Sequence, residues 1–259
     1  MIRKEAAGTP AALFIERNVM LTTVLFDLDG TLLPMELDAF LETYFDLLAK
    51  KLISHGYDSN KVMDGLWEGL MAMIRNDGSC TNEKAFLDRF SQEVGRDAWA
   101  DMPLLQDFYN HEFHGAKSAC GFDPKAVETV AAVKARGLRV VLATNPMYPA
   151  IATKKRMGWA GFKPEDFELY TTYEVFSHCK PNPAYFQDVL DRLGLKAEEC
   201  LMVGNDALED MAAEKIGMKV FLLPQYLVNR YNLDTASYPH GDFDDLLEYI
   251  DALQKGAVK

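Results

Sequence analysis

The apolar run at residues 24–26 leads directly into two aspartates, Asp27 and Asp29, and then into Gly30. Successive side chains of an extended chain point to opposite sides, so residues two apart can point into the same cleft. Two carboxylates at the end of a buried strand are costly unless a cation or a proton shares the site. The segment therefore predicts a divalent-metal site in which one carboxylate attacks and the other handles a proton. Taken alone, it also fits an Asp-rich turn that ends a hydrophobic strand.

Three later segments place chemically active side chains after a short apolar strand or in a proline-rich loop. They are residues 138–143 before Thr144 and Asn145, the loop 179–183 around Lys180, and residues 201–203 before Asn205, Asp206 and Asp210. In open α/β sheets, ligands bind outside the carboxyl ends of the strands. Residues more than a hundred positions apart are therefore expected to converge there. Each residue has an ordinary structural explanation when taken singly, and their joint occurrence in order favours a site.

These segments predict an α/β fold: a doubly wound, mainly parallel Rossmann-like sheet with helices on both faces. Strands are expected near residues 22–27, 138–144, 167–171, 200–204 and 219–223. Helices are expected to begin near Pro124 and Ala184, to run from the 206–210 segment to Gly217, and to run from Phe243 to about Leu253. The last of these helices is expected to dock on the core.

About ninety residues separate Leu33 from the helix near Pro124, which is far too many for a connection within a compact sheet. Apolar residues in this segment recur at helical spacing and predict an inserted domain of at least four helices. The helices are expected from about Phe40 to Ile53, from Asn60 to Ile74, after Asn82 as a capping residue, and from Pro103 to His114. The predicted division is a Rossmann-like catalytic core at residues 1–33 and 121–259 and a helical domain at 34–120. An inert helical subdomain is the alternative for the insert.

In the order and context of these motifs, the chain resembles the haloacid dehalogenase-like (HAD) hydrolase superfamily. The resemblance covers residues from about 22 to 33 and from about 123 to 223. It implies a Mg²⁺ cofactor, and it implies that the insert at 34–120 is a C1-type helical cap. Caps of this type close over the cleft, exclude water and select the substrate.

The resemblance also implies a role for each motif residue. The catalytic residues are Asp27 as the nucleophile, Asp29 as the general acid/base, and Lys180 as the cation that steadies nucleophile and phosphate. The phosphate-binding residues are Thr144, Asn145 and Lys180, and the metal residues are Asp27, Asp29 through its backbone carbonyl, Asp206 and Asp210. One departure is that Asn205 intervenes where many relatives read Gly-Asp directly. Asp206 is the expected direct ligand because its spacing to Asp210 fits, and Asn205 and Glu209 stay open as alternatives.

The favoured function is a Mg²⁺-dependent phosphatase that hydrolyses a small phosphorylated metabolite through an aspartyl-phosphate intermediate. A dehalogenase or a phosphonatase is disfavoured, because those branches lack the second aspartate and Asp29 is present. A phosphomutase stays open, because it keeps both aspartates and a similar cap. A catalytically silent protein that binds a phosphorylated ligand is a further alternative, although binding alone does not require a nucleophile.

The amino-acid composition limits the kinds of molecule that this protein is expected to bind. The chain has 27 basic and 39 acidic residues, a net charge of −12, which argues against a nucleic-acid surface. No apolar stretch reaches the ~20 residues needed to cross a bilayer. The four cysteines show no paired spacing and are expected to be free thiols in a reducing cytoplasm. We therefore expect a cytoplasmic enzyme with a small-molecule substrate, as a monomer or weak homodimer.

Two further segments are given no catalytic role. His111 and His114 flank Glu112 but lie three residues apart, whereas the helical zinc-protease motif needs histidines four apart. The segment from Met1 to Met20 is not expected to be a signal peptide, because Glu16 and Arg17 interrupt its apolar patch. It is expected to be a short extension, with Met20 as an alternative start.

Overall fold

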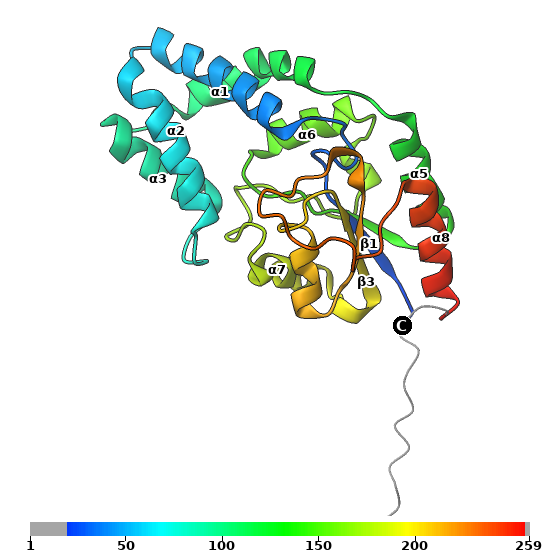
Figure 1. The fold of residues 1–259 in the computed structure, drawn as a ribbon. Coiled ribbons are helices and arrows are strands. Elements are labelled where there is room, and N and C mark those ends of the chain that lie inside the picture. Colours follow the sequence, from blue (N-terminus) through cyan, green and yellow to red (C-terminus); the bar gives the residue numbers. More distant parts are fainter. Residues whose placement is uncertain (1–19, 257–259) are drawn as a thin grey trace, which may run out of the picture.

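Four parallel strands form the central sheet of the computed structural model, which describes residues 20–256 (Figure 1). The strands are β1 (Thr23–Phe26), β2 (Arg139–Leu142), β3 (Cys200–Gly204) and β4 (Lys219–Leu222), in the spatial order β2-β1-β3-β4. β1 thus lies between two strands that come more than a hundred residues later. The predicted α/β fold with a parallel sheet is confirmed. The segment from Met1 to Met20 lies outside the described residues, apart from Met20 itself.

The register of the strands brings their carboxyl ends to one edge of the sheet. Phe26, at the end of β1, pairs with Leu142 on β2 and with Val203 on β3. The residues that follow these strands therefore leave the sheet side by side, as the site prediction requires. The strand expected at residues 167–171 is not formed. This segment runs beside β2 and bridges to it only between Leu142 and Tyr170, because its few backbone hydrogen bonds do not extend into a ladder.

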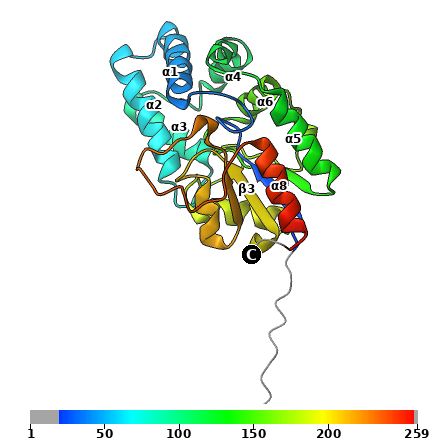
Figure 2. The same ribbon diagram turned by 45° about the vertical axis from the view of Figure 1, so that its right-hand side comes forward.

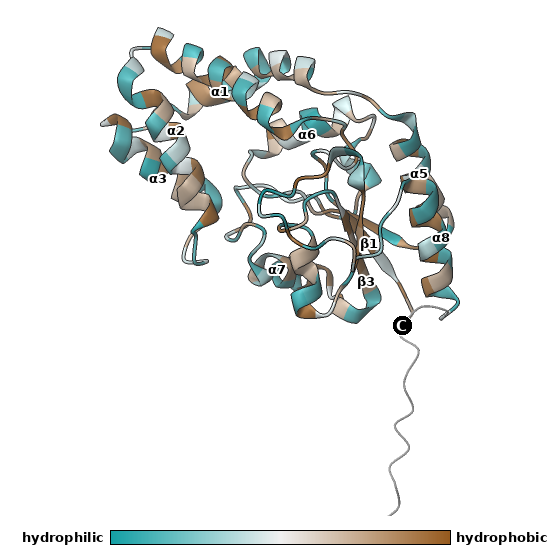
Figure 3. Cartoon of the chain, viewed as in Figure 1, coloured by the Kyte–Doolittle hydropathy of each residue, from teal (hydrophilic) through white to brown (hydrophobic). Residues whose placement is uncertain are grey.

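Alternate side chains of the strands face two different layers of helices. Val24 and Phe26 of β1 pack on one face, and Leu25 packs on the other. The first face is covered by α5 (Pro124–Ala135) and α8 (Phe243–Gln254), and the second by α7 (Pro183–Leu193) and the 3₁₀ helix η4 (Met211–Ile216). Figure 3 shows the apolar strands enclosed by helices that carry hydrophilic residues. The last helix docks on α5 as predicted.

Five helical elements between β1 and α5 form the helical insert, which we define as residues 34–120. They are α1 (Leu37–Ser54), α2 (Ser59–Ile74), α3 (Asn82–Val94), α4 (Met102–Asn110) and the 3₁₀ helix η1 (Glu112–Ala119). Figures 1 and 2 show them as a group next to α6 (Ala150–Trp159) and away from α8. α2 and α3 approach closely at Gly69. A Cβ atom at this position would lie only 2.8 Å from the ring of Phe86. The helical nature of the insert is confirmed.

The insert joins the rest of the molecule through paired connections and a shared apolar interior. The entering and leaving segments lie side by side, with Gly121 N donating to Pro34 O at 2.7 Å and a bridge between Met35 and Cys120. One continuous cluster of buried side chains includes Tyr44 of the insert as well as Val24 of the sheet. The insert therefore packs directly on the elements that carry the carboxyl edge.

Two further local predictions are wrong. The cap of α3 is Thr81, whose hydroxyl accepts from Lys84 N, whereas the Asn82 side chain points into the interface with the core. The regular helix expected from residues 206–210 to Gly217 is a series of turns followed by η4, because the Asp206 carboxylate and not a helical carbonyl accepts the next amides.

The remaining short helices are the 3₁₀ turns η2 (Pro164–Asp166), η3 (Ala197–Glu199) and η5 (Pro224–Tyr226). None of the helices described between residues 20 and 256 combines the length and the hydropathy needed to cross a bilayer.

Candidate active site

The candidate site lies at the carboxyl edge of the sheet and is centred on the ammonium group of Lys180. Its Nζ atom lies 2.9 Å from Asp27 Oδ1 and 2.6 Å from Asp210 Oδ1. Asp27 follows β1 directly, and Asp210 follows the turn after β3. All three side chains are buried, so water screens their charges little. The fold thus brings together three of the predicted residues from three distant segments.

Lys180 is held as a cation by its neighbours. Burial lowers the pKa of its ammonium group, but the carboxylates of Asp210 and Asp27 outweigh burial and raise this pKa well above its ordinary value. The opposite balance holds for Asp210, because burial raises the pKa of its carboxyl group against the attraction of Lys180. The site therefore keeps one permanent positive charge between two acids.

The turn after β3 orients two acids in different ways. Asp206 Oδ1 accepts hydrogen bonds from the backbone amides of Leu208 and Glu209, each at 2.8 Å. Asp210 uses both carboxylate oxygens, one for Lys180 and one for the backbone amide of Asp206 at 2.9 Å. Asp206 thus keeps an oxygen that makes no hydrogen bond within residues 20–256, whereas Asp210 braces the turn and the lysine.

Asn205 is fully engaged inside the protein. Its Oδ1 accepts from the Thr31 hydroxyl at 2.9 Å, and its Nδ2 donates to Tyr226 O at 2.6 Å. It also packs against the first acidic turn, because a Cβ atom on Gly30 would lie 2.3 Å from Asn205 Nδ2. Asn205 therefore ties the segment after β1 to the segment after β3.

Asn145, in the loop after β2, contacts both the turn after β3 and the loop that carries Lys180. Its Nδ2 donates to Glu209 Oε2 at 2.8 Å, and its Oδ1 accepts from Lys180 N at 3.2 Å. Burial raises the pKa of Glu209 to about 8, with a further contribution from the charge of Asp206. Glu209 thus accepts a hydrogen bond from Asn145 and ionises less readily than an ordinary glutamate.

Thr144 is connected to Lys180 only indirectly, through its backbone carbonyl and Tyr185. Its carbonyl oxygen accepts from the Tyr185 hydroxyl at 3.0 Å, and the Thr171 hydroxyl donates to the same oxygen. The Lys180 ammonium lies 5.8 Å from the centre of the Tyr185 ring. Tyr185 of α7 therefore positions the end of β2 relative to the lysine.

The second acid of the first motif is paired with an arginine. Asp29 Oδ2 forms an ion pair with Arg156, which lies on α6 and is completely buried. The guanidinium carbon of Arg156 lies 4.0 Å from the centre of the Tyr148 ring. Burial raises the pKa of the Asp29 carboxyl group, and the positive charge of Arg156 opposes this rise.

A family model described as haloacid dehalogenase-like hydrolase matches residues 21–217 of this chain. The chain belongs to the haloacid dehalogenase-like hydrolase family. The match includes the whole insert and every motif residue from Asp27 to Asp210, so the predicted family is confirmed. The protein is accordingly a hydrolase of this family.

Relatives and solved structures agree with this membership. A phosphoglycolate phosphatase of Rhodospirillum rubrum is 29% identical over 208 residues, covering 77% of this chain and 78% of that protein. The pyrophosphatase PpaX of Bacillus mycoides is 24% identical over 236 residues, covering 89% and 97%. The crystal structure of a 2-haloacid dehalogenase from Pseudomonas syringae pv. Tomato DC3000 matches with a TM-score of 0.60 and 20% identity, covering 90% of this chain and 99% of that one. A β-phosphoglucomutase from Clostridium difficile matches with a TM-score of 0.57 and 14% identity, covering 92% and 99%. These structural likenesses concern the fold alone.

Arg156 is a residue of this HAD-like hydrolase that the sequence analysis did not single out. It lies in the segment Lys154-Lys155-Arg156, where neighbouring basic residues at the surface give the same pattern. The only local signal is that Arg156 shares the buried face of α6 with Ala152 and Thr153. Its partner, Asp29, is contributed by a turn more than a hundred residues earlier.

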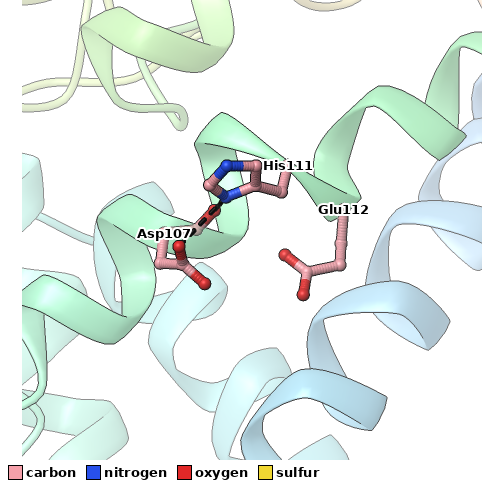
Figure 4. A group of neighbouring side chains, drawn as sticks. All are labelled: Asp107, His111 and Glu112. Carbon is pink, nitrogen blue, oxygen red and sulfur yellow. Dashed lines mark hydrogen bonds and ion pairs between the residues drawn. The ribbon is translucent and has the colours of Figure 1, made fainter.

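A second acidic group lies in the insert, where Asp107, His111 and Glu112 place possible ligand atoms within reach of one another (Figure 4). The Lys51 ammonium lies 2.5 Å from Asp107 Oδ2 and 2.7 Å from Glu112 Oε1. A cation of the protein thus already offsets part of the charge of these acids, and their side chains are exposed to solvent. We assign no metal site to this group.

Proposed function

We propose that this HAD-like hydrolase is a Mg²⁺-dependent phosphatase that acts on a small phosphorylated metabolite through an aspartyl-phosphate intermediate. The observation that carries the proposal is the buried contact of Lys180 with Asp27 Oδ1 at 2.9 Å, directly after the central strand. Asp27 Oδ2 makes no hydrogen bond or ion pair within residues 20–256, which leaves one oxygen for attack on phosphorus. The names of the relatives, a phosphoglycolate phosphatase and a pyrophosphatase, support phosphoryl chemistry.

In the first step, a bond forms between Asp27 and phosphorus while the bond from phosphorus to the leaving oxygen breaks. Asp29 gives a proton to the leaving oxygen, so that the product leaves as a neutral alcohol. In the second step, water attacks the aspartyl-phosphate, returns a proton to Asp29 and releases phosphate and Asp27. Lys180 and the Thr144–Asn145 loop would bind the phosphoryl oxygens and stabilise their charge.

The residues present fit a divalent cation. Five carboxylates gather at this edge, from Asp27, Asp29, Asp206, Glu209 and Asp210, against the two cations Lys180 and Arg156. The carboxylates thus outnumber the cations. Burial raises the pKa of Asp206, whereas the amides of Glu209 and Leu208 and the charge of Lys180 oppose this rise. Mg²⁺ prefers carboxylate and carbonyl oxygens. Asp27, the Asp29 carbonyl and Asp206 would hold it, with Asp210 as a support, and it would neutralise charge on the phosphoryl group.

The structure also favours Asp206 over the two alternatives for direct metal binding. Both polar atoms of the Asn205 side chain are used by Thr31 and Tyr226. Glu209 accepts from Asn145 through Oε2, which ties its carboxylate to the loop after β2. Asp206 keeps a free carboxylate oxygen, and we therefore retain it as the proposed ligand.

We further propose that the insert at residues 34–120 acts as the cap that selects the substrate. Asn82 at the start of α3 is completely buried and donates to Pro146 O at 3.1 Å, next to the Thr144–Asn145 loop. The insert thus touches the proposed phosphate-binding loop directly. A cytoplasmic location and a monomeric or weakly dimeric state stay predictions.

The test is hydrolysis of p-nitrophenyl phosphate with Mg²⁺, with a chelator, and by the Asp27→Asn variant. An amide cannot form the acyl phosphate, so this variant should lose at least about 100-fold in turnover while keeping its circular dichroism spectrum. Asp46→Asn, on the exposed face of α1, is the matched control and should behave like wild type. Turnover close to wild type in Asp27→Asn would remove Asp27 from the nucleophile role, and turnover unaffected by chelation would remove the metal.

A further inference from the structure

The ion pair between Arg156 and Asp29 is an unusual feature of the site. Arg156 is the largest completely buried side chain among the described residues, and it reaches Asp29 from α6 on a different segment. Burying a guanidinium group is costly unless its charge is paired and its N–H groups are bonded. Its position beside a proposed acid/base residue therefore calls for an explanation.

The pair is incompletely satisfied, in contrast to an ion pair that only holds a fold together. Arg156 Nε is buried without a hydrogen-bond partner among the described residues, and so is Asp29 Oδ1. Buried polar atoms are normally bonded, so two adjacent exceptions suggest a role other than stability. α6 also buries Ala152, Met157 and Trp159, so it does not need the arginine in order to dock.

The geometry restricts what Asp29 can do. Arg156 binds Oδ2, and the Tyr148 ring, 4.0 Å from the guanidinium carbon, limits the movement of the arginine. The carboxylate plane of Asp29 is therefore fixed from one side, and its Oδ1 is buried without a partner among the described residues. A proton-transferring group is effective only when its reacting oxygen is held in place.

We propose that Arg156 is a positioning residue, which anchors one oxygen of Asp29 and so fixes the orientation of the carboxyl group that exchanges protons with the leaving group and then with water. Arg156 does not touch the substrate in this scheme and acts only through Asp29. The inference rests on the proposed function, in which Asp29 is the general acid/base. It assigns to Tyr148 the role of holding the arginine.

The test compares phenyl phosphate with p-nitrophenyl phosphate, two substrates of similar shape whose leaving groups differ in their need for a proton. kcat/KM reports the steps up to departure of the leaving group, so it measures proton donation by Asp29. Arg156→Met should lower kcat/KM about 100-fold for phenyl phosphate and less than about 10-fold for p-nitrophenyl phosphate. Arg156→Lys should recover part of the loss, because it keeps the charge without the planar fork.

Lys154→Met is the matched control, because it removes a positive charge from the exposed face of the same helix. It should leave both kcat/KM values unchanged. Thermal unfolding of each variant checks that the fold is kept. If Arg156→Met does not fold, Arg156→Lys and Tyr148→Leu decide the question by the same ratio of the two substrates, with a larger loss on phenyl phosphate expected for both.

An equal loss on both substrates, or no loss on either, would overturn the positioning role. These results are distinguishable from failure of the proposed function. The proposed function fails when wild-type protein hydrolyses neither substrate with Mg²⁺, or when Asp27→Asn stays active. The positioning role alone fails when Asp27→Asn is inactive and the folded Arg156 variants show no difference between the leaving groups.

Discussion

Two lysines of this protein each lie between two carboxylates, one in the core and one in the helical insert, and their surroundings differ. Lys180 lies 2.9 Å from Asp27 and 2.6 Å from Asp210, with at most 10% of any of these side chains exposed. Lys51 lies 2.5 Å from Asp107 and 2.7 Å from Glu112, whose side chains are 49% and 40% exposed. Each group consists of one ammonium and two carboxylates, at similar distances.

The pKa of Asp210 nevertheless shifts in the opposite direction from those of Asp107 and Glu112. In the core, burial raises the pKa of Asp210 in spite of the neighbouring lysine. In the insert, the hydrogen bond from Lys51 lowers the pKa of Asp107 and of Glu112, because burial contributes less there. Buried ion groups stabilise a fold poorly, whereas exposed ones cost little to form. The comparison indicates that chemistry rather than stability explains the buried group.

The largest expected effect is the difference in stability and turnover between replacing Lys180 and replacing Lys51. Lys180→Met leaves two buried acids without their cation, and it should destabilise the protein by about 3–5 kcal/mol in chelator and remove turnover. Lys51→Met should leave the melting temperature and the turnover close to wild type, since water can solvate Asp107 and Glu112. Urea unfolding and p-nitrophenyl phosphate hydrolysis measure both. Equal losses of stability in the two variants would refute the distinction between the groups.

The second prediction concerns the choice of metal ligand between the two acidic groups. Asp206→Asn should weaken Mg²⁺ binding most, because Asp206 keeps a free oxygen, and Asp210→Asn should have a smaller effect because both its oxygens are bonded within the protein. Glu209→Gln should matter less than either. Activation by Mg²⁺ and direct calorimetric titration give the order.

Asp107→Asn is the control for this series and should leave the Mg²⁺ titration unchanged. A weaker titration in Asp107→Asn would move the metal site to the insert. If Asn205→Ala proved the most damaging change, the proposed register of the acidic turn would be shifted by one residue.

The third prediction concerns the neutral contact that joins the two regions. Asn82 donates to Pro146 O at 3.1 Å and accepts from Asn76 Nδ2 at 2.8 Å, both within the buried interface. Asn82→Ala removes both hydrogen bonds from the buried interior and should cost about 1–3 kcal/mol. It should also reduce discrimination among phosphorylated metabolites more than it reduces p-nitrophenyl phosphate hydrolysis. Asn60→Ala, on the exposed start of α2, is the control; unchanged discrimination in Asn82→Ala would weaken the cap proposal.

The smallest expected effect is on the pH dependence of the melting temperature that arises from the acids of the insert. The pKa values of Asp107 and Glu112 are lowered in the folded protein, so the unfolded chain binds more protons at acid pH. Their contribution to the free energy of unfolding is present above the unfolded pKa values of about 4, and it is lost as the pH falls through the lower folded values. Lys51→Met should therefore reduce the acid-side fall of the melting temperature. Identical melting curves from about pH 6 to pH 3 in variant and wild type would contradict this linkage.

The motif residues were predictable because most follow a strand whose pattern is local and Lys180 lies in a proline-rich loop before a helix. Asp27 follows an apolar run and Lys180 lies three residues before Pro183, the first residue of α7, so order and context suffice to single them out. Arg156 was not predictable, because a buried arginine and an exposed one have the same local sequence. Asn82 was expected to cap α3, but Thr81 takes that role, since the tertiary contact with Pro146 competes for the asparagine side chain. The expected strand at residues 167–171 also depended on pairing partners that the sequence does not show.

The sequence by itself determined the order of strands and turns, the acids that follow the strands, and the long insert, because these depend on local hydropathy and spacing. Only the tertiary structure decided which charges meet and in what surroundings. Burial and water access differ between Lys180 and Lys51, although both have two acidic neighbours, and the pKa is raised for Asp210 but lowered for Asp107. Electrostatic free energies depend on distance and on solvent in three dimensions, and neither quantity is written in the local sequence.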